Sequence, residues 1–243
     1  MGRNGGKWII HRVLRDEKLL SEHLPETQLL TEESLWELLD RHRVVIVKPC
    51  MGRFGYGVIQ VSKLGEDHFQ IHNQAKKIAF TSRDQTYRYL MDQKPKRKYY
   101  VVQQKIPLAH IDGNPFDIRV MVQRRKGSTE WNVTGKVCKV AAEHFIVTNV
   151  AREVLTIEEA SFRSSLFVVP LQFILSEIDR VSLLTSVTLG NYYSGQLTFG
   201  LDVGCDQKGH IWIIEVNLAP SLVPFRLLKD KSMLRKIKSF YKR

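Results

Sequence analysis

Hydrophobic residues recur along this chain with two periods, and each period predicts one kind of secondary structure. Helical spacing places Leu35, Leu38 and Leu39 on one face of a predicted helix. The same spacing predicts a longer helix from about 171 to 189, which we expect Gly190 to end. Thr31 can cap the helix that carries these leucines, and Ser82 with Gln85 and Thr156 with Glu159 mark the starts of two further helices.

Alternation of apolar and polar residues marks the strands. The segments "FDIRVMVQ" and "EWNVTGKVCKVA" alternate and are joined by the turn-like "RRKGST", which predicts an antiparallel hairpin. A second hairpin is predicted for "LTFGLDVGC" and "HIWIIEVN". Because strand pairs are mixed with helices without strict strand–helix alternation, we expect the α+β class with mainly antiparallel sheets.

Length, cysteine content and hydropathy narrow the class of protein. With 243 residues the chain can bury a sizeable core in one or two domains. Cys50, Cys138 and Cys205 are odd in number and far apart, so we expect small buried hydrophobes in a reducing compartment. No apolar run approaches the length that spans a bilayer, so the sequence predicts a cytoplasmic protein that does not enter membranes.

The net charge of +12 is compatible with phosphorylated ligands, polyanions or acidic partners. Much of this charge lies in 226–243, where basic residues and apolar residues at helical spacing predict a basic amphipathic C-terminal helix. Such a helix can pack its apolar stripe on the protein, bind a membrane or bind nucleic acid. We favour packing on the protein, and no nucleic-acid-binding motif accompanies the charge.

A strand that ends in a lysine and opens into a glycine-spaced loop is the first candidate for chemistry. In "VVIVKPCMGRFGYGVIQV", Lys48 leaves a strand on a defined face. Gly52, Gly55 and Gly57 then leave backbone N–H groups able to surround an anion. The alternative is a hairpin with a flexible tip, because the loop matches neither GxGxxG nor GxxxxGK[ST].

Three residues with oxygen atoms in their side chains form a candidate metal site. Asp202 and Glu215 lie across the second predicted hairpin in near register, and Asn217 shares a face with Glu215. Glu215 stands among isoleucines and valine, so we expect it to be buried and to need a cation. Two carboxylates and one amide oxygen suit Mg²⁺ in a nucleotide site. The alternative is a surface hairpin with ordinary acidic residues, which suits Asp206 better than Glu215.

The strand "FDIRVMV" supplies the next candidate. One face carries Phe116, Ile118, Val120 and Val122, which leaves Asp117 and Arg119 on the other. An arginine held on a rigid strand is a good clamp for phosphate oxygens. A local ion pair between Asp117 and Arg119 is the alternative, and the two arrangements can coexist.

Four segments, in their order along the chain, resemble the ATP-grasp fold: "VVIVKPCMGRFGYGVIQV", "YYVVQQKI", "DGNPFDIRVMVQ" and "FGLDVGCDQKGHIWIIEVNLAP". The lead-in "HLPETQLLTEESLWELL" and the phrase "FIVTNV" resemble its YheC/YheD-like, endospore coat-associated branch. The resemblance extends from about Lys7 to Pro220. It implies an ATP-grasp domain of residues 1–225, with two α+β subdomains, about 44–105 and about 106–225, that clamp ATP.

The resemblance also implies roles for individual residues. Lys48 would contact the ATP phosphates and Arg119 the terminal phosphates, as the catalytic residues, and Asp202, Glu215 and Asn217 would bind Mg²⁺. The implied reaction is the ligation of a carboxylate to an amine or thiol, driven by Mg-ATP through an acyl phosphate. The other implied ATP-binding residues are Lys7, by a looser match, Gly52, Gly55 and Gly57 in a flap, and Gln103, Gln104 and Ile106 at the adenine.

The chain departs from the family's pattern in three places. Related enzymes usually have a further N-terminal domain that helps to bind the carboxylate, and we expect this domain to be lacking. Lys139 stands where the branch tends to have arginine, and "AREV" stands where a glycine pair often follows. We therefore expect substrate recognition to be altered, shared with a protein partner that supplies it, or lost. The alternative function is a non-catalytic ATP-binding scaffold or regulatory protein, associated with spores.

Overall fold

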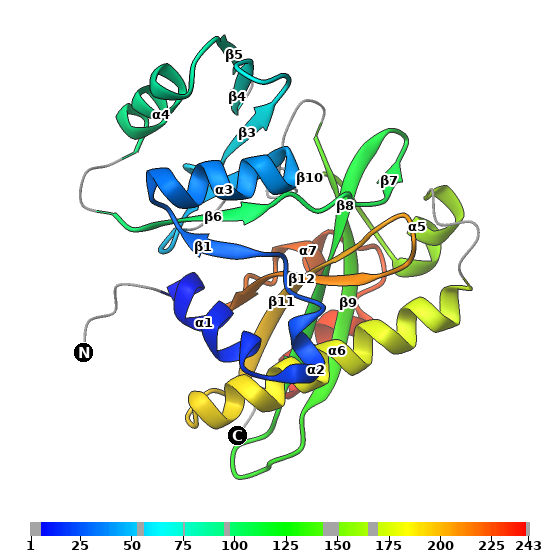
Figure 1. The fold of residues 1–243 in the computed structure, drawn as a ribbon. Coiled ribbons are helices and arrows are strands. Elements are labelled where there is room, and N and C mark those ends of the chain that lie inside the picture. Colours follow the sequence, from blue (N-terminus) through cyan, green and yellow to red (C-terminus); the bar gives the residue numbers. More distant parts are fainter. Residues whose placement is uncertain are drawn as a thin grey trace. The chain divides into compact units, whose positions relative to one another are not determined.

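The computed structural model describes residues 6–52, 56–74, 76–94, 98–142, 151–164 and 170–241, which form two compact units (Figure 1). The first unit contains 6–11 and Pro25–Lys105, and the second contains Arg12–Leu24, Ile106–Ala142 and the described residues from 151 onward. Neighbouring strands in the described sheets are antiparallel. The α+β class with antiparallel sheets is therefore confirmed.

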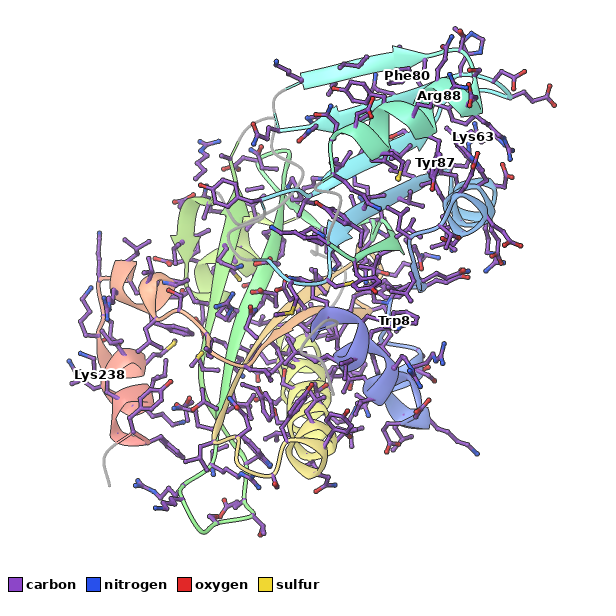
Figure 2. The ribbon with its side chains drawn as sticks, turned by 90° about the vertical axis from the view of Figure 1, so that its left-hand side faces the viewer. Trp8, Lys63, Phe80, Tyr87, Arg88 and Lys238 are labelled. Carbon is purple, nitrogen blue, oxygen red and sulfur yellow. The ribbon has the colours of Figure 1, made fainter. Side chains whose placement is uncertain are left out.

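The first unit is a six-stranded sheet with helices on one face. Its elements are β1 (Thr27–Leu29), α3 (Glu32–His42), β2 (Val44–Pro49), β3 (Ile59–Lys63), β4 (Phe69–Asn73), β5 (Lys76–Phe80), α4 (Arg83–Asp92) and β6 (Tyr100–Gln104). The strands pair in the order β1-β6-β2-β3-β4-β5. Leu35, Leu38 and Leu39 of α3 are fully buried in the core, so the helix predicted from their spacing is confirmed. Phe80 and Tyr87 pack at the margin of this core (Figure 2).

The second unit contains the other sheet, in the order β10-β9-β8-β11-β12, with β7 paired to β8. Both hairpins predicted from sequence alternation are present, as β8 with β9 and β11 with β12. The elements are α2 (Lys18–Ser21), β7 (His110–Ile111), β8 (Asn114–Gln123), β9 (Asn132–Ala141), β10 (Ala151–Leu155), α5 (Ile157–Arg163), α6 (Leu171–Tyr192), β11 (Thr198–Cys205), β12 (Ile211–Asn217), α7 (Val223–Leu227) and α8 (Ser232–Ser239), while α1 (Gly6–Arg15) has residues in both units.

The two faces of the second sheet are covered by different helices. Met121 of β8 and Val137 of β9 pack with Phe225 of α7 and Ile237 of α8. Adjacent residues of a strand point to opposite faces, so Val120 points to the face on which α6 packs. Arg119 and Asp117 lie two and four positions before Met121. They therefore point to the face on which α7 and α8 pack.

Gly190 lies inside α6 and does not end it, so that expectation was wrong. A Cβ atom at this position would lie 2.8 Å from Cζ2 of Trp131, and Trp131 in turn packs on Phe199 of β11. The absence of a side chain lets α6 approach the indole ring closely. This glycine thus serves packing, and α6 continues to Tyr192.

The C-terminal segment contains two short helices in place of the single helix expected from residue 226. The chain becomes extended at Leu228, and the Lys231 ammonium donates to two carbonyl oxygens at the end of α7, those of Arg226 and Leu228. The apolar stripe of α8 packs on the sheet through Ile237, while Lys238 lies on the outer side of the helix (Figure 2).

The segment Arg12–Leu24 is held along the edge strand β12. The backbone N–H of Ile213 donates to the carbonyl oxygen of His23 over 2.8 Å, and Nδ1 of His23 donates to the carbonyl oxygen of Ile211 over 2.7 Å. The rings of His23 and His210 stack with centroids 5.0 Å apart. A short piece of chain from a distant part of the sequence therefore lies beside the last strand of this sheet.

Cys50, Cys138 and Cys205 are free and buried, as expected. Burial raises the pKa of each thiol, that of Cys205 to about 12, so all three behave as small hydrophobes. Within the described ranges, we find no helix with the length and apolarity needed to cross a bilayer.

The variant Gly190→Ala tests the packing role of this glycine. The added methyl group meets the rigid ring of Trp131, and we expect a net loss of about 1–2 kcal/mol in the free energy of unfolding, measured with urea. Gly195→Ala is the matched control, because a Cβ atom there meets nothing within 4 Å. Equal effects of the two substitutions would contradict the packing role.

Candidate functional site

Strand register in the second unit places several charged side chains in one row. Arg119 of β8 is the Cα partner of Asp202 of β11, and Asp202 is the partner of Glu215 of β12. Asp117 of β8 is likewise opposite Lys139 of β9. Directly paired residues in an antiparallel sheet share a face. The predicted register of Asp202 and Glu215 is confirmed, and both lie on the face of α7 and α8.

Asp202 accepts hydrogen bonds on both carboxylate oxygens. Arg119 donates from Nε to Oδ1 over 2.8 Å and from Nη2 to Oδ2 over 2.9 Å. Nζ of Lys139 lies 3.0 Å from Oδ1, and Nδ2 of Asn217 donates to Oδ2 over 3.2 Å. A carboxylate offers about four lone-pair positions, so these four donors occupy Asp202 completely.

Lys139 joins two carboxylates. Its Nζ lies 3.1 Å from Oδ1 of Asp117 as well as 3.0 Å from Asp202, and all three side chains are buried. The local ion pair considered between Asp117 and Arg119 is replaced by pairs between strands, Asp117 with Lys139 and Arg119 with Asp202. The charges of two acidic and two basic side chains therefore balance on this face of the sheet.

The electrostatics of this cluster follow from burial and pairing. Burial alone would raise the pKa of the Asp202 carboxyl, but the charges of Lys139 and Arg119 outweigh it and lower that pKa to about 2. Burial would lower the pKa of Arg119 and of Lys139, and the neighbouring carboxylates raise both. All three groups are ionised at neutral pH.

Glu215 is half-buried, so the expectation that it is a buried acid was wrong. Of the two acids in the candidate metal site, the deeply buried one is Asp202, which is 5% exposed. The reason is strand order, because β12 lies at the edge of the sheet and β11 lies between β12 and β8. Asn217, on the same face two residues further on, is also half-buried.

The residues of this site fit a Mg²⁺ ion under one condition, which concerns Asp202. Glu215 and Asn217 present oxygen atoms at the accessible edge, and oxygen donors are the ligands that Mg²⁺ prefers. Asp202 fits only if one of its four donors moves away, because its oxygens are already occupied. In the described part of the chain no three His, Cys, Asp or Glu side chains gather as a metal site. Asp202, Glu215 and Asn217 suit an ion that has few protein ligands and completes its coordination with phosphate and water.

In the first unit, Lys48 is oriented by a chain of hydrogen bonds. The buried Nζ donates to Oε1 of Gln103 over 2.7 Å, Nε2 of Gln103 donates to Oγ1 of Thr27 over 2.7 Å, and Thr27 donates to the carbonyl oxygen of Pro25. The side chain of Gln103 is thus engaged in holding Lys48. Gln104, expected with Gln103 at the adenine, accepts on Oε1 from the backbone N–H of Glu26.

Lys7 lies near the loop that follows β2. Its backbone N–H donates to the carbonyl oxygen of Cys50 over 3.1 Å, and its Nζ donates to that of Gly52 over 3.4 Å. The charges of Lys7 and Lys48 both act on the Cys50 thiol, against the larger effect of burial on its pKa. Gly57 has a positive φ of 76°. Gly55 and the phrase "FIVTNV" lie outside the described residues.

Sequence reasoning missed two links of these networks. Thr27, which orients Gln103, comes from a three-residue strand without a recognisable pattern. The bridge from Lys139 to Asp117 and Asp202 was missed as well, although strand alternation in "GKVCKVA" could have placed Lys139 on a defined face.

The fold is that of ATP-grasp proteins. It matches D-alanine–D-alanine ligase from Bacillus anthracis complexed with ATP with a TM-score of 0.53 and 15% identity, over 97% of this chain and 63% of the ligase. The chain belongs to the YheC/D-like ATP-grasp family, whose model matches residues 3–241. The family resemblance seen in the sequence is therefore confirmed.

Two relatives from Bacillus subtilis (strain 168) are named endospore coat-associated proteins. YheD is 27% identical over 222 residues, which are 88% of this chain and 48% of YheD. YheC is 24% identical over 219 residues, 88% of this chain and 59% of YheC. The chain thus spans about half the length of these curated relatives.

The pH dependence of stability tests the Asp202 cluster. Because its pKa is depressed in the folded protein, Asp202 contributes stability that is complete above about pH 4 and is lost as the pH falls through about 2. The contribution is about 2 kcal/mol. In Asp202→Asn we expect a loss of about 3–5 kcal/mol at pH 7 and a smaller further decline in acid, measured by urea unfolding from pH 7 to pH 2.

The exposed turn residue Asp67 provides the control, because Asp67→Asn removes the same charge without touching the cluster. Its unfolding curve should follow the wild type at every pH. An Asp202→Asn protein as stable as the wild type at pH 7 would show that the cluster does not stabilise the fold.

Proposed function

We propose that this protein binds Mg-ATP and ligates a carboxylate to an amine or a thiol. The observation that carries the proposal is the buried pair of Arg119 and Asp202, fixed on adjacent strands beside the half-buried side chains of Glu215 and Asn217. Transfer of a phosphoryl group depends mainly on positioning and charge stabilisation, and a rigid sheet that holds cations and oxygen ligands supplies both. Membership of the ATP-grasp family supports the same function.

Each unit is proposed to contribute its own part to ATP binding. In the first unit, Lys48 binds phosphate oxygens and Gln103 orients it, with Lys7 and the flap glycines Gly52, Gly55 and Gly57 as further phosphate ligands. Residues Gln104 and Ile106 are proposed to contact the adenine. In the second unit, Arg119 binds the terminal phosphates. Its contacts to Asp202 use Nε and Nη2, and a guanidinium has five N–H donors, so Nη1 remains for a phosphate oxygen.

The proposed chemistry has two steps. A substrate carboxylate oxygen attacks the terminal phosphorus of ATP, the bond to the bridging oxygen breaks, and ADP leaves with formation of an acyl phosphate. An amine or thiol then attacks the acyl carbon, loses its proton and expels inorganic phosphate. Lys48 and Arg119 hold the phosphate oxygens in line and offset their charge in both steps. Bound Mg²⁺, held by Glu215, Asn217 and Asp202, would supply further charge neutralisation to the phosphates.

The second candidate function is a non-catalytic ATP-binding protein. The observation that favours it is the full occupation of Asp202 by its four donors. The relatives' names support an association with spores for either function. For the ligase, we propose that a protein partner takes part in substrate recognition.

Calorimetry of ATP binding tests the nucleotide site. We expect the wild type to bind ATP in the presence of Mg²⁺ and to bind it about tenfold more weakly in Glu215→Gln, because a charged oxygen ligand is lost. Glu130→Gln, in the exposed turn between β8 and β9, should bind like the wild type. Folded wild-type protein that binds no ATP with Mg²⁺ would refute both candidate functions.

Trapping with hydroxylamine separates the ligase from the scaffold. Hydroxylamine converts an acyl phosphate into a hydroxamate, so a screen of carboxylic acids with Mg-ATP should yield a hydroxamate and an equal amount of ADP. Lys48→Met should lower this yield by about two orders of magnitude, because loss of one preorganised charge costs several kcal/mol in the transition state. Tight ATP binding without hydroxamate from any acid would favour the scaffold.

A further inference from the structure

Lys139 differs from Arg119 in how it holds Asp202. Arg119 binds the carboxylate through two parallel N–H···O bonds, at 2.8 and 2.9 Å. Lys139 makes one contact with Asp202 at 3.0 Å and another with Asp117 at 3.1 Å. A bidentate pair is geometrically fixed, whereas an ammonium is a compact charge on a flexible stem. Lys139 can therefore leave Asp202 and remain paired with Asp117.

We propose that Lys139 keeps Asp202 closed to divalent cations until a nucleotide is bound. The inference rests on the proposed Mg-ATP site and identifies Lys139 as a positioning residue for it. Without nucleotide, a cation that approaches Asp202 meets two positive side chains and a carboxylate whose lone pairs are occupied. Movement of Lys139 toward Asp117 frees one lone pair on Oδ1 of Asp202.

The charge balance explains why the nucleotide triggers the change. Asp117, Asp202, Arg119 and Lys139 are neutral as a set, so the buried cluster has no excess negative charge to attract a free ion. Glu215 adds only one charge, at the accessible edge. The phosphates bring several negative charges and attract both Arg119 and the ion. The site thus binds the ion together with the phosphates and discriminates against the ion alone.

Mn²⁺ is a suitable probe, because it prefers oxygen ligands as Mg²⁺ does. Its binding in the absence of nucleotide can be followed by electron paramagnetic resonance. We expect weak binding to the wild type and binding at least about tenfold tighter in Lys139→Met, which frees one lone pair of Oδ1 and leaves one net negative charge in the cluster. Lys136→Met is the matched control, since Lys136 lies on the same strand but pairs with Asp179.

The double variant Lys139→Met with Asp117→Asn guards against misfolding of the single variant. It removes one buried charge of each sign, and it also frees one lone pair on Oδ1 of Asp202, so it should bind Mn²⁺ more tightly than the wild type. Asp117→Asn alone has the opposite expectation, because Lys139 loses its second anion and stays on Asp202. In that variant Mn²⁺ should bind no better than in the wild type, and Mg-ATP about tenfold more weakly.

The proposal is overturned if folded variants that lack Lys139 bind Mn²⁺ no more tightly than the wild type does. The proposed function fails separately, when wild-type protein with Mg²⁺ binds no ATP in the calorimeter. The Mn²⁺ titration contains no nucleotide, so the two failures are distinguishable.

Discussion

The pairing of Asp202 with Arg119 and Lys139 is the interaction on which the second unit depends. An ionised carboxylate is costly to bury, and only close cations and hydrogen-bond donors make its burial tolerable. Here the cations come from β8 and β9 and the acid from β11, so the cluster can form only when the three strands are in register. The same contacts that stabilise the sheet hold the side chains proposed to meet the phosphates and the metal ion.

Lys48 in the first unit is held in a different way. The amide oxygen of Gln103 fixes the direction of its ammonium group without neutralising the charge, and Thr27 in turn fixes Gln103. The two units thus hold these cations through different contacts, with carboxylates around Arg119 and Lys139 and with the amide oxygen of Gln103 at Lys48.

Local patterns predicted much of this fold, and contacts between distant segments account for what they missed. Alternation and turn residues gave the β11–β12 hairpin and placed Asp202 opposite Glu215. Asp202 is more deeply buried than Glu215 because the strand of Glu215 lies at the sheet edge. The apolar neighbours of Glu215 contain no information about this strand order. Gly190 was misread as a helix end because the ring it contacts, Trp131, is far away in the sequence. The roles of the individual site residues remain predictions.

The segment that lies beside β12 has a consequence for the solubility of the protein. An edge strand presents unpaired N–H and C=O groups that can pair with a strand of another molecule. His23 occupies such groups of Ile211 and Ile213, and this shortens the length of β12 open to another chain. One edge strand of the other sheet, β5, begins instead with the exposed lysines Lys76 and Lys77, whose charges oppose association. The chain thus protects two sheet edges from aggregation by different means, one by covering backbone groups and the other by electrostatic repulsion.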